Sequence, residues 1–257
     1  MKKGTYTILF AVLIIFCLVM FLLFGVDNIK KGNREATIIL GDNTVWTYKD
    51  NKWAHVVNYT SIQKLNWQSY YVFSNNEKVG KFYLWHDDKW YVFDKNKSAV
   101  DIDGNLLAYR SNYEMPVFDF TLEEIENKAY IEKVLEENGI STSSFFTVSS
   151  QVVFDFDNDG NAEKFYLVSN AFPIDFEPDV IFSVVIMVKD DTIYPIYTDF
   201  SENQSFNGCK PFFNTFMDVN NDNNYEVVLS CANYSVSEQL DMLYSFENNE
   251  FKLVISN

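Results

Sequence analysis

The acidic stretch DFDNDGNAE at residues 155–163 recurs as DVNNDNNYE at residues 218–226. Both copies follow the pattern D-x-[DN]-x-D-[GN]-x-x-E, and both are entered and left by β-type residues, such as Val152–Phe154 and Val227–Leu229. Side-chain oxygens at positions 1, 3, 5 and 9, with a backbone carbonyl at position 7, can surround one hard cation such as Ca²⁺. We name these stretches loop 1 and loop 2, and the sequence predicts a metal site in each.

Polar turns flanked by aromatic residues form a second repeat. They span residues 48–53, 85–90 and 246–251, with a looser relative at 188–193. Asn and Asp tolerate positive φ and bond to their own backbone, so we expect a tight hairpin at each turn. Each acidic loop is followed by one such turn, and the two loops begin 63 residues apart. This period is typical of propeller blades or a β-array.

One segment departs from the β pattern. Thr121 and Glu124 form a capping-box signature, apolar residues then recur at helical spacing, and Gly139 is placed to end a helix. We therefore expect an amphipathic helix at residues 121–138 that packs against a sheet. The expected fold class is mainly β, with repeated antiparallel β units that are propeller-like or an array, this one helix, and an N-terminal transmembrane helix.

The N-terminus has the properties of a membrane anchor. No charged residue occurs between Lys3 and Asp27, and the apolar run Ile8–Val26 has 19 residues, or roughly 28 Å of helix. A cleaved signal peptide is the competing interpretation, but its apolar region is shorter and ends at small residues. We expect an uncleaved signal anchor at residues 7–26, after a cytoplasmic tail at 1–6 and before a juxtamembrane linker at 27–37.

Charge restricts the partners and the compartment. Five basic residues and Asp27 give residues 1–34 a net charge of +4. The whole chain carries −16, so residues 35–257 carry −20. An acidic surface repels phosphates, so nucleic acid is excluded as a partner. Calcium loops of modest affinity suit the calcium level outside cells, which favours a single-pass protein of the cell membrane with its C-terminal domain extracellular. That domain divides into a β-hairpin region at 38–115, a helical connector at 116–145 and two calcium-loop repeats at 146–257.

Two cysteines flank loop 2. Cys209 and Cys231 are the only cysteines outside the apolar N-terminal run, and a strand–loop–strand unit brings its two arms together. A disulfide between them would stabilise the fold by roughly 3 kcal/mol. Two free, buried cysteines are the alternative.

The acidic loops resemble those of FG-GAP and VCBS-type repeats, including the calcium loops of integrin α-chain propellers. In that family the loop joins adjacent strands of a β-blade and holds a structural Ca²⁺. The resemblance covers roughly residues 150–230, lacks the Phe-Gly…Gly-Ala-Pro signature, and places Asn223 where loop 1 has Gly160. It implies these ligands, with the asparagine at position 7 supplying its carbonyl: Asp155, Asp157, Asp159, Asn161 and Glu163 in loop 1; Asp218, Asn220, Asp222, Asn224 and Glu226 in loop 2.

Spacing separates these loops from an EF-hand. An EF-hand needs an acidic residue at position 12, where this chain has Tyr166 and Leu229. Loop 1 presents four carboxylates, whereas loop 2 presents three and an amide, so we expect loop 1 to bind Ca²⁺ more tightly. The alternative is that both loops are metal-free Asx-type turns.

Catalytic motifs are weak in this sequence. Its two histidines, His55 and His86, lie in predicted hairpins, and the sequence has no Gly-x-Ser-x-Gly elbow, phosphate-binding glycine loop or zinc pattern. Trp53, Trp67 and Trp90 are either sugar-stacking residues or core residues. We expect a binding, adhesion or structural module at a bacterial cell surface, with an unidentified protein or glycan ligand. The alternative is a surface enzyme that acts on cell-envelope glycans through paired carboxylates.

Overall fold

The computed structural model describes residues 34–74, 77–102, 106–141, 146–171, 180–202, 209–233 and 239–257. The predicted cytoplasmic tail and transmembrane anchor lie outside these ranges. Within them, no helix is long and apolar enough to cross a membrane. The described chain is mainly β, with antiparallel sheets and two helices, which confirms the general fold class.

The N-terminal strands form sheet A, in the order β3-β2-β1-β8-β4-β5-β6-β7, with the short helix α3 (Tyr59–Gln63) between β3 and β4. β1 begins at Glu35, which pairs with Lys49. Residues 35–37, predicted as the end of the linker 27–37, therefore belong to the first strand. The strands are β1 (Glu35–Leu40), β2 (Thr44–Lys49), β3 (Lys52–His55), β4 (Gln68–Ser74), β5 (Glu77–His86), β6 (Trp90–Phe93), β7 (Ala99–Val100) and β8 (Leu107–Ser111).

The remaining strands form two further sheets, each containing a four-stranded meander. Sheet C has the order β10-β11-β12-β13, and sheet B has the order β17-β16-β15-β14-β9. The strands of sheet C are β10 (Val148–Phe154), β11 (Glu163–Ser169), β12 (Val180–Lys189) and β13 (Thr192–Glu202). Those of sheet B are β9 (Val117–Phe118), β14 (Cys209–Met217), β15 (Glu226–Asn233), β16 (Gln239–Glu247) and β17 (Glu250–Ser256).

The two meanders have the same plan. Loop 1 joins the first and second strands of sheet C, and loop 2 joins the corresponding strands β14 and β15 of sheet B. A tight turn joins the third and fourth strands in both, with positive φ at residues 190 and 191 and at 248 and 249. The hairpins predicted around residues 50 and 88 also form, as β2–β3 and β5–β6. All four predicted hairpins are therefore confirmed.

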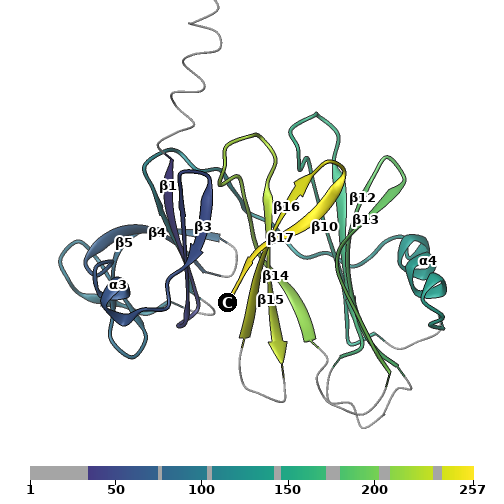
Figure 1. Ribbon diagram of the computed structural model, residues 1–257, viewed down its shortest axis with the longest axis horizontal. Helices are drawn as coiled ribbons and strands as arrows, with labels where there is room; N and C mark the ends of the chain where they lie inside the picture. Colours follow the sequence, from purple (N-terminus) through teal and green to yellow (C-terminus); the bar gives the residue numbers. More distant parts are fainter. Residues whose placement is uncertain are drawn as a thin grey trace, which may run out of the picture.

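The three sheets stand in a row, with sheet B between sheets A and C (Figure 1). β15 shows why the middle sheet is apolar on both faces. Its Val227 and Leu229 pack in the core shared with sheet C, whereas Val228 packs against sheet A. The described residues do not close a propeller ring.

The helix is shorter than expected. α4 spans Ala129–Glu137, and Gly139 (φ +72) follows its C-terminus as predicted. The predicted start at residue 121 is wrong, because the backbone of Glu123 instead forms a two-way hydrogen-bonded bridge with Gln151 of β10. The Thr121–Glu124 capping box is therefore not a helix start. α4 covers the outer face of sheet C, as the predicted packing role requires (Figure 1).

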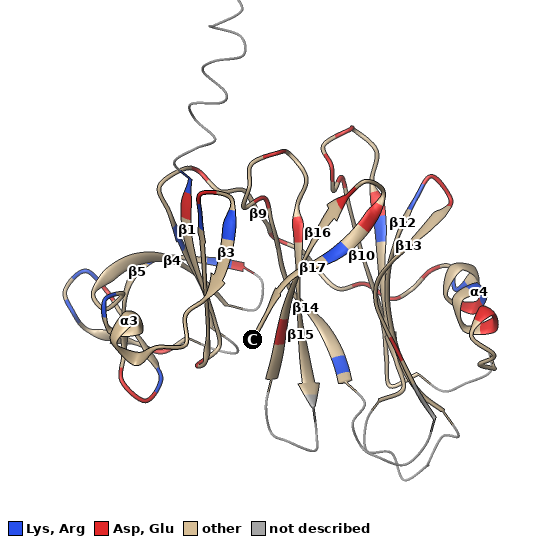
Figure 2. Cartoon of the chain, viewed as in Figure 1, with Lys and Arg blue, Asp and Glu red and all other residues tan. Residues whose placement is uncertain are grey.

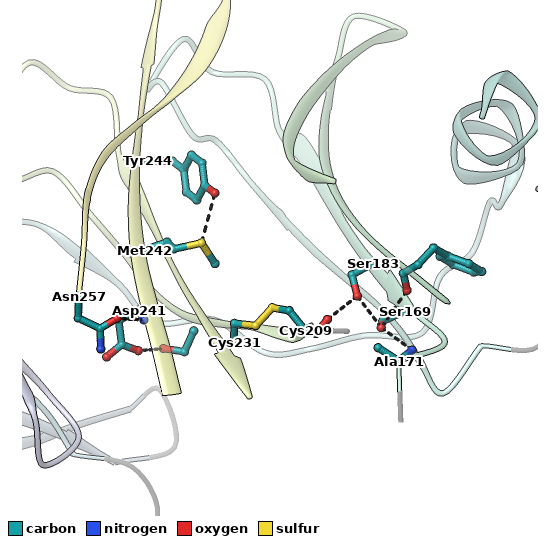
Figure 3. Close-up of a disulfide and its surroundings, with 11 residues drawn as sticks. Ser169, Ala171, Ser183, Cys209, Cys231, Asp241, Met242, Tyr244 and Asn257 are labelled. Carbon is teal, nitrogen blue, oxygen red and sulfur yellow. Dashed lines mark hydrogen bonds between the residues drawn. A yellow bond between two sulfur atoms is a disulfide. The ribbon is translucent and has the colours of Figure 1, made fainter. Parts of the chain in front are cut away.

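The predicted disulfide is present. Cys209 of β14 and Cys231 of β15 are bonded across the two antiparallel strands, with Cα atoms 5.4 Å apart (Figure 3). The carbonyl of Cys209 also accepts a hydrogen bond from the hydroxyl of Ser183 in β12. The disulfide therefore lies where sheet B meets sheet C.

Candidate functional site

Loops 1 and 2 are held by the same backbone hydrogen bonds. In loop 1 the carboxylate of Asp155 accepts bonds from the N–H groups of Asp159 and Gly160, both at 3.0 Å. In loop 2 the carboxylate of Asp218 accepts bonds from the residues at the same two positions, Asp222 and Asn223, both at 3.1 Å. The first acidic residue of each loop therefore folds the loop around itself.

The last residue of each loop is a buried glutamate. Glu163 Oε2 accepts a hydrogen bond from the N–H at position 2 at 2.7 Å, and Glu226 Oε2 accepts the corresponding bond at 2.8 Å. These residues are 1% and 3% exposed. Burial raises the pKa of both carboxyl groups, against the opposing effect of the backbone N–H.

Positive φ angles occur at the same two positions of each loop. Position 4 is Asn158 (φ +56) or Asn221 (φ +54), and position 6 is Gly160 (φ +93) or Asn223 (φ +73). Asparagine enters this left-handed region at a modest cost, which is why it replaces glycine in loop 2. The repeated sequence pattern thus encodes one repeated backbone conformation.

The loops differ in what faces their carboxylates. The ammonium of Lys189, at the end of β12, contacts three acidic side chains of loop 1: it bonds Asp157, lies 2.7 Å from Asp159 Oδ2 and lies 3.4 Å from Glu163 Oε1. Burial acts to lower the pKa of Lys189, but its bonds to Asp157 and Asp159 raise that pKa above the ordinary lysine value. The bond from Lys189 in turn lowers the pKa of Asp159.

Neutral groups contact the carboxylates of loop 2. The side-chain amide of Asn220 donates to Glu226 Oε1 at 2.9 Å, where loop 1 has the ammonium of Lys189. Arg34 and Tyr113 reach loop 2 as well, but they donate to backbone carbonyls, those of Asn220 and Val219. Burial raises the pKa of Asp218. Among the described residues, no ion pair involves a carboxylate of loop 2.

The two loops also contact each other. The side-chain amide of Asn158 donates to the carbonyl of Asn223 at 2.8 Å, and the N–H of Tyr225 donates to the carbonyl of Phe156 at 3.3 Å. Figure 2 shows both loops, with their acidic residues, at the same edge of the molecule. This edge therefore forms a continuous hydrogen-bonded path from Arg34 through loop 2 and loop 1 to Lys189.

Three of the predicted carboxylate ligands are brought together in loop 1, whereas the three carboxylates of loop 2, which the structure also describes, do not form an equally close cluster. Carboxylate oxygens of Asp155, Asp157 and Asp159 lie within 4.8 Å of one another, and Asp157 Oδ1 is buried without a hydrogen-bond partner. At position 7, the N–H groups of Asn161 and Asn224 both donate to the acidic residue at position 5, at 2.8 Å. Oxygen-only donor sets of this kind suit a hard cation rather than zinc or copper.

A separate cavity of about 720 Å³ lies beside sheet A and the segment leading to β9. The rings of Tyr71 and Tyr109 lie 5.3 Å apart at its wall, and the Lys78 ammonium is 4.0 Å from the Tyr71 ring centroid. Glu114 and Asp119 also line this cavity. Its volume falls in the range of small-molecule sites.

Sequence reasoning did not identify Lys189 or the cavity residues. Lys189 lies in the polar turn segment 188–193, whose pattern predicts a hairpin but no contact with loop 1, and the strand register of sheet C brings it there. Of the predicted aromatic candidates, Trp90 is buried in the core of sheet A, whereas Trp67 is 44% exposed and lies outside the cavity.

Comparisons with known proteins add no relative to these observations. No protein-family model, no curated protein and no solved structure matches the chain.

Proposed function

We propose that this chain is a membrane-anchored extracellular protein whose β repeats are stabilised by Ca²⁺ and which serves as a binding, adhesion or structural module at a bacterial cell surface. The repeats correspond to FG-GAP or VCBS-type units arranged as an open array of sheets. The anchor is the apolar segment at residues 7–26.

One observation carries this proposal: two acidic loops at equivalent positions of two meanders share one backbone conformation and the same hydrogen bonds. The buried carboxyl groups of these loops, those of Glu163, Asp218 and Glu226, cost stability unless positive charge or hydrogen bonds offset them. A scaffold role accounts for this arrangement better than catalysis does, because the loops are bonded to each other and to neighbouring sheets.

Calcium fits loop 2 because its oxygens come from Asp218, Asn220, Asp222 and Glu226, with the carbonyl of Asn224. None of these carboxylates has a lysine or arginine partner among the described ion pairs. The oxygen of the Asn220 amide lies inside the loop, where it accepts a hydrogen bond from the N–H of Asp222 at 2.9 Å. A divalent ion there would hold together the strands β14 and β15 and the neighbouring loop 1.

The test is calcium binding by the full chain in detergent after removal of metal by EDTA. Calorimetry should record Ca²⁺ binding, and the melting temperature should rise with Ca²⁺ and fall with EDTA. Asp222→Ala should reduce both signals, whereas Asp42→Ala, an exposed aspartate in another hairpin, should leave them unchanged. Absence of heat, with a melting temperature indifferent to EDTA, would remove calcium from the proposal.

The cavity beside sheet A is the proposed ligand site of the module. Its tyrosine faces can stack on a sugar ring or an apolar group, and its lysines can pair with an anionic substituent. Tyr71→Ala should weaken binding to immobilised cell-wall glycan by about tenfold, as expected from loss of one stacking ring. Tyr83→Ala, a partly exposed tyrosine of β5 outside the cavity, is the matched control. Equal binding by both variants and the unaltered protein would exclude the cavity.

The same cavity contains two acidic residues that suit the alternative function, a surface glycosidase. Glu114 and Asp119 both line it and both raise the pKa of Tyr109, after the larger effects of burial and of Tyr71. In a surface glycosidase, these carboxyl groups would be the paired acids. Release of soluble sugars from cell-wall glycan, lost in Glu114→Gln and Asp119→Asn, would favour the enzyme over the binding module.

A further inference from the structure

We propose that Lys189 is the resident cation of loop 1, so that loop 1 closes without metal and the exchangeable Ca²⁺ site is confined to loop 2. The assignment of Ca²⁺ to loop 2 rests on the proposed function, whereas the role of Lys189 in loop 1 does not. This inference reverses the affinity order expected from the sequence.

The Lys189 ammonium uses the oxygens that a metal ion would need. It contacts the side chains at positions 3, 5 and 9 of loop 1, which are Asp157, Asp159 and Glu163. The remaining carboxylate, that of Asp155, is already bonded through both oxygens to backbone N–H groups. Asp157 Oδ1 still has no hydrogen-bond partner, but loop 1 has what the carboxylates of loop 2 lack among the described residues, a contact with a full positive charge.

Among the described residues, the strand register explains why a lysine contacts the carboxylates of loop 1 and not those of loop 2. In sheet C, Lys164 pairs with Val188, and Lys189 is the next residue. At the same step in sheet B, Val227 pairs with Tyr244, and the next residue is Ser245. A serine hydroxyl is short and neutral, so it supplies no charge to loop 2.

Charge then no longer favours loop 1. Counting only groups that contact the carboxylates, its four carboxylates and one ammonium leave a net charge of −3, which equals that of the three carboxylates of loop 2, where Arg34 contacts backbone carbonyls. A divalent ion entering loop 1 must displace an ammonium held at three contacts. In loop 2 it meets only neutral donors, which are the Asn220 amide on Glu226 and backbone N–H groups on Asp218, Asp222 and Glu226. Loop 2 is therefore the site at which no charged group of the described residues has to be displaced.

The experiment counts bound Ca²⁺ on the full chain in detergent, by equilibrium dialysis at about 1 mM Ca²⁺, a level at which extracellular calcium modules bind. The unaltered protein should bind one ion and Lys189→Met should bind two. Lys189→Arg, which keeps the positive charge, should bind one. Lys252→Met is the matched control, because that ammonium also lies near two carboxylates but at an exposed site, and it should bind one.

Other outcomes separate the two proposals. No ion in the unaltered protein and one in Lys189→Met would support Lys189 as the resident cation and reject calcium at loop 2. Two ions in the unaltered protein, or no additional ion in folded Lys189→Met, would overturn the inference. If Lys189→Met does not fold, the Asp222→Ala variant, which keeps Lys189, provides the test. This variant should bind no Ca²⁺, and one bound ion would overturn the inference.

Discussion

The meander of sheet C and that of sheet B share a plan but differ in how each is secured. In sheet C, loop 1 is closed by Lys189, and the outer face is covered by α4. In sheet B, no described lysine or arginine pairs with a carboxylate of loop 2, a disulfide ties β14 to β15, and both faces are covered by other sheets. The comparison teaches that one acidic backbone motif can be stabilised through different chemistry in adjacent repeats.

The largest expected difference in stability between the two repeats comes from the buried residue at position 11, counted from the first residue of each loop. Phe165 is fully buried toward sheet B, and Val228 is fully buried toward sheet A. Phe165→Ala should lower the free energy of unfolding by about 3–5 kcal/mol, because it opens a cavity among Phe154, Phe213 and Phe216. Val228→Ala should cost less, about 1–2 kcal/mol. Urea denaturation measures both, and equal losses would contradict this ordering.

The disulfide is the next test, because only the sheet B repeat contains one. Replacing both cysteines, as Cys209→Ser with Cys231→Ser, should cost about 3 kcal/mol for a closed loop of this length. Urea denaturation of the unaltered protein with dithiothreitol should reproduce the loss, while the double variant should not respond to the reductant. A reductant effect of equal size on the variant would show that the loss has another source.

A smaller effect is expected where the two repeats touch. Asn158→Gly keeps a residue suited to positive φ but removes the hydrogen bond to the Asn223 carbonyl, so it should cost about 0.5–1.5 kcal/mol. Asn248→Gly, at a positive-φ site in the β16–β17 turn, is the control and should be nearly neutral. Thermal melting distinguishes the two, and equal shifts would mean that the contact between the loops contributes nothing.

The smallest effect is expected from exchanging position 6 between the loops. Gly160→Asn and Asn223→Gly should each change stability by only a few tenths of a kcal/mol, because asparagine tolerates positive φ. Nothing lies within 4 Å of a Cβ added at Gly160, so packing does not oppose the change. Gly160→Val, a β-branched control, should be clearly destabilising in the same melting experiment. A large cost for Gly160→Asn would show that the two loops differ in backbone more than their φ angles indicate.

Local features of this fold were predictable from the sequence, whereas non-local ones were not. The hairpins and both loops depend on Asn, Asp and Gly at adjacent positions, and the disulfide follows from the strand–loop–strand unit around loop 2. The start of α4 was predicted wrongly because Glu123 pairs with Gln151, which lies 28 residues away in sequence. Lys189 was missed for the same reason, because its place beside loop 1 depends on the pairing of β11 with β12. The order of the sheets, with the last repeat in the middle, also depends on long-range packing.

The position of α4 gives the row of sheets an end. An open array of sheets grows for as long as its terminal face remains apolar and bare, and repeat proteins stop this growth with dedicated caps. Here Ile131 and Leu135 of α4 cover the outer face of sheet C, and Ile62 and Leu65 pack into the outer core of sheet A. Among the described residues, α4 thus closes the sheet C end of the row. A second copy could stack on that face only after displacing the helix.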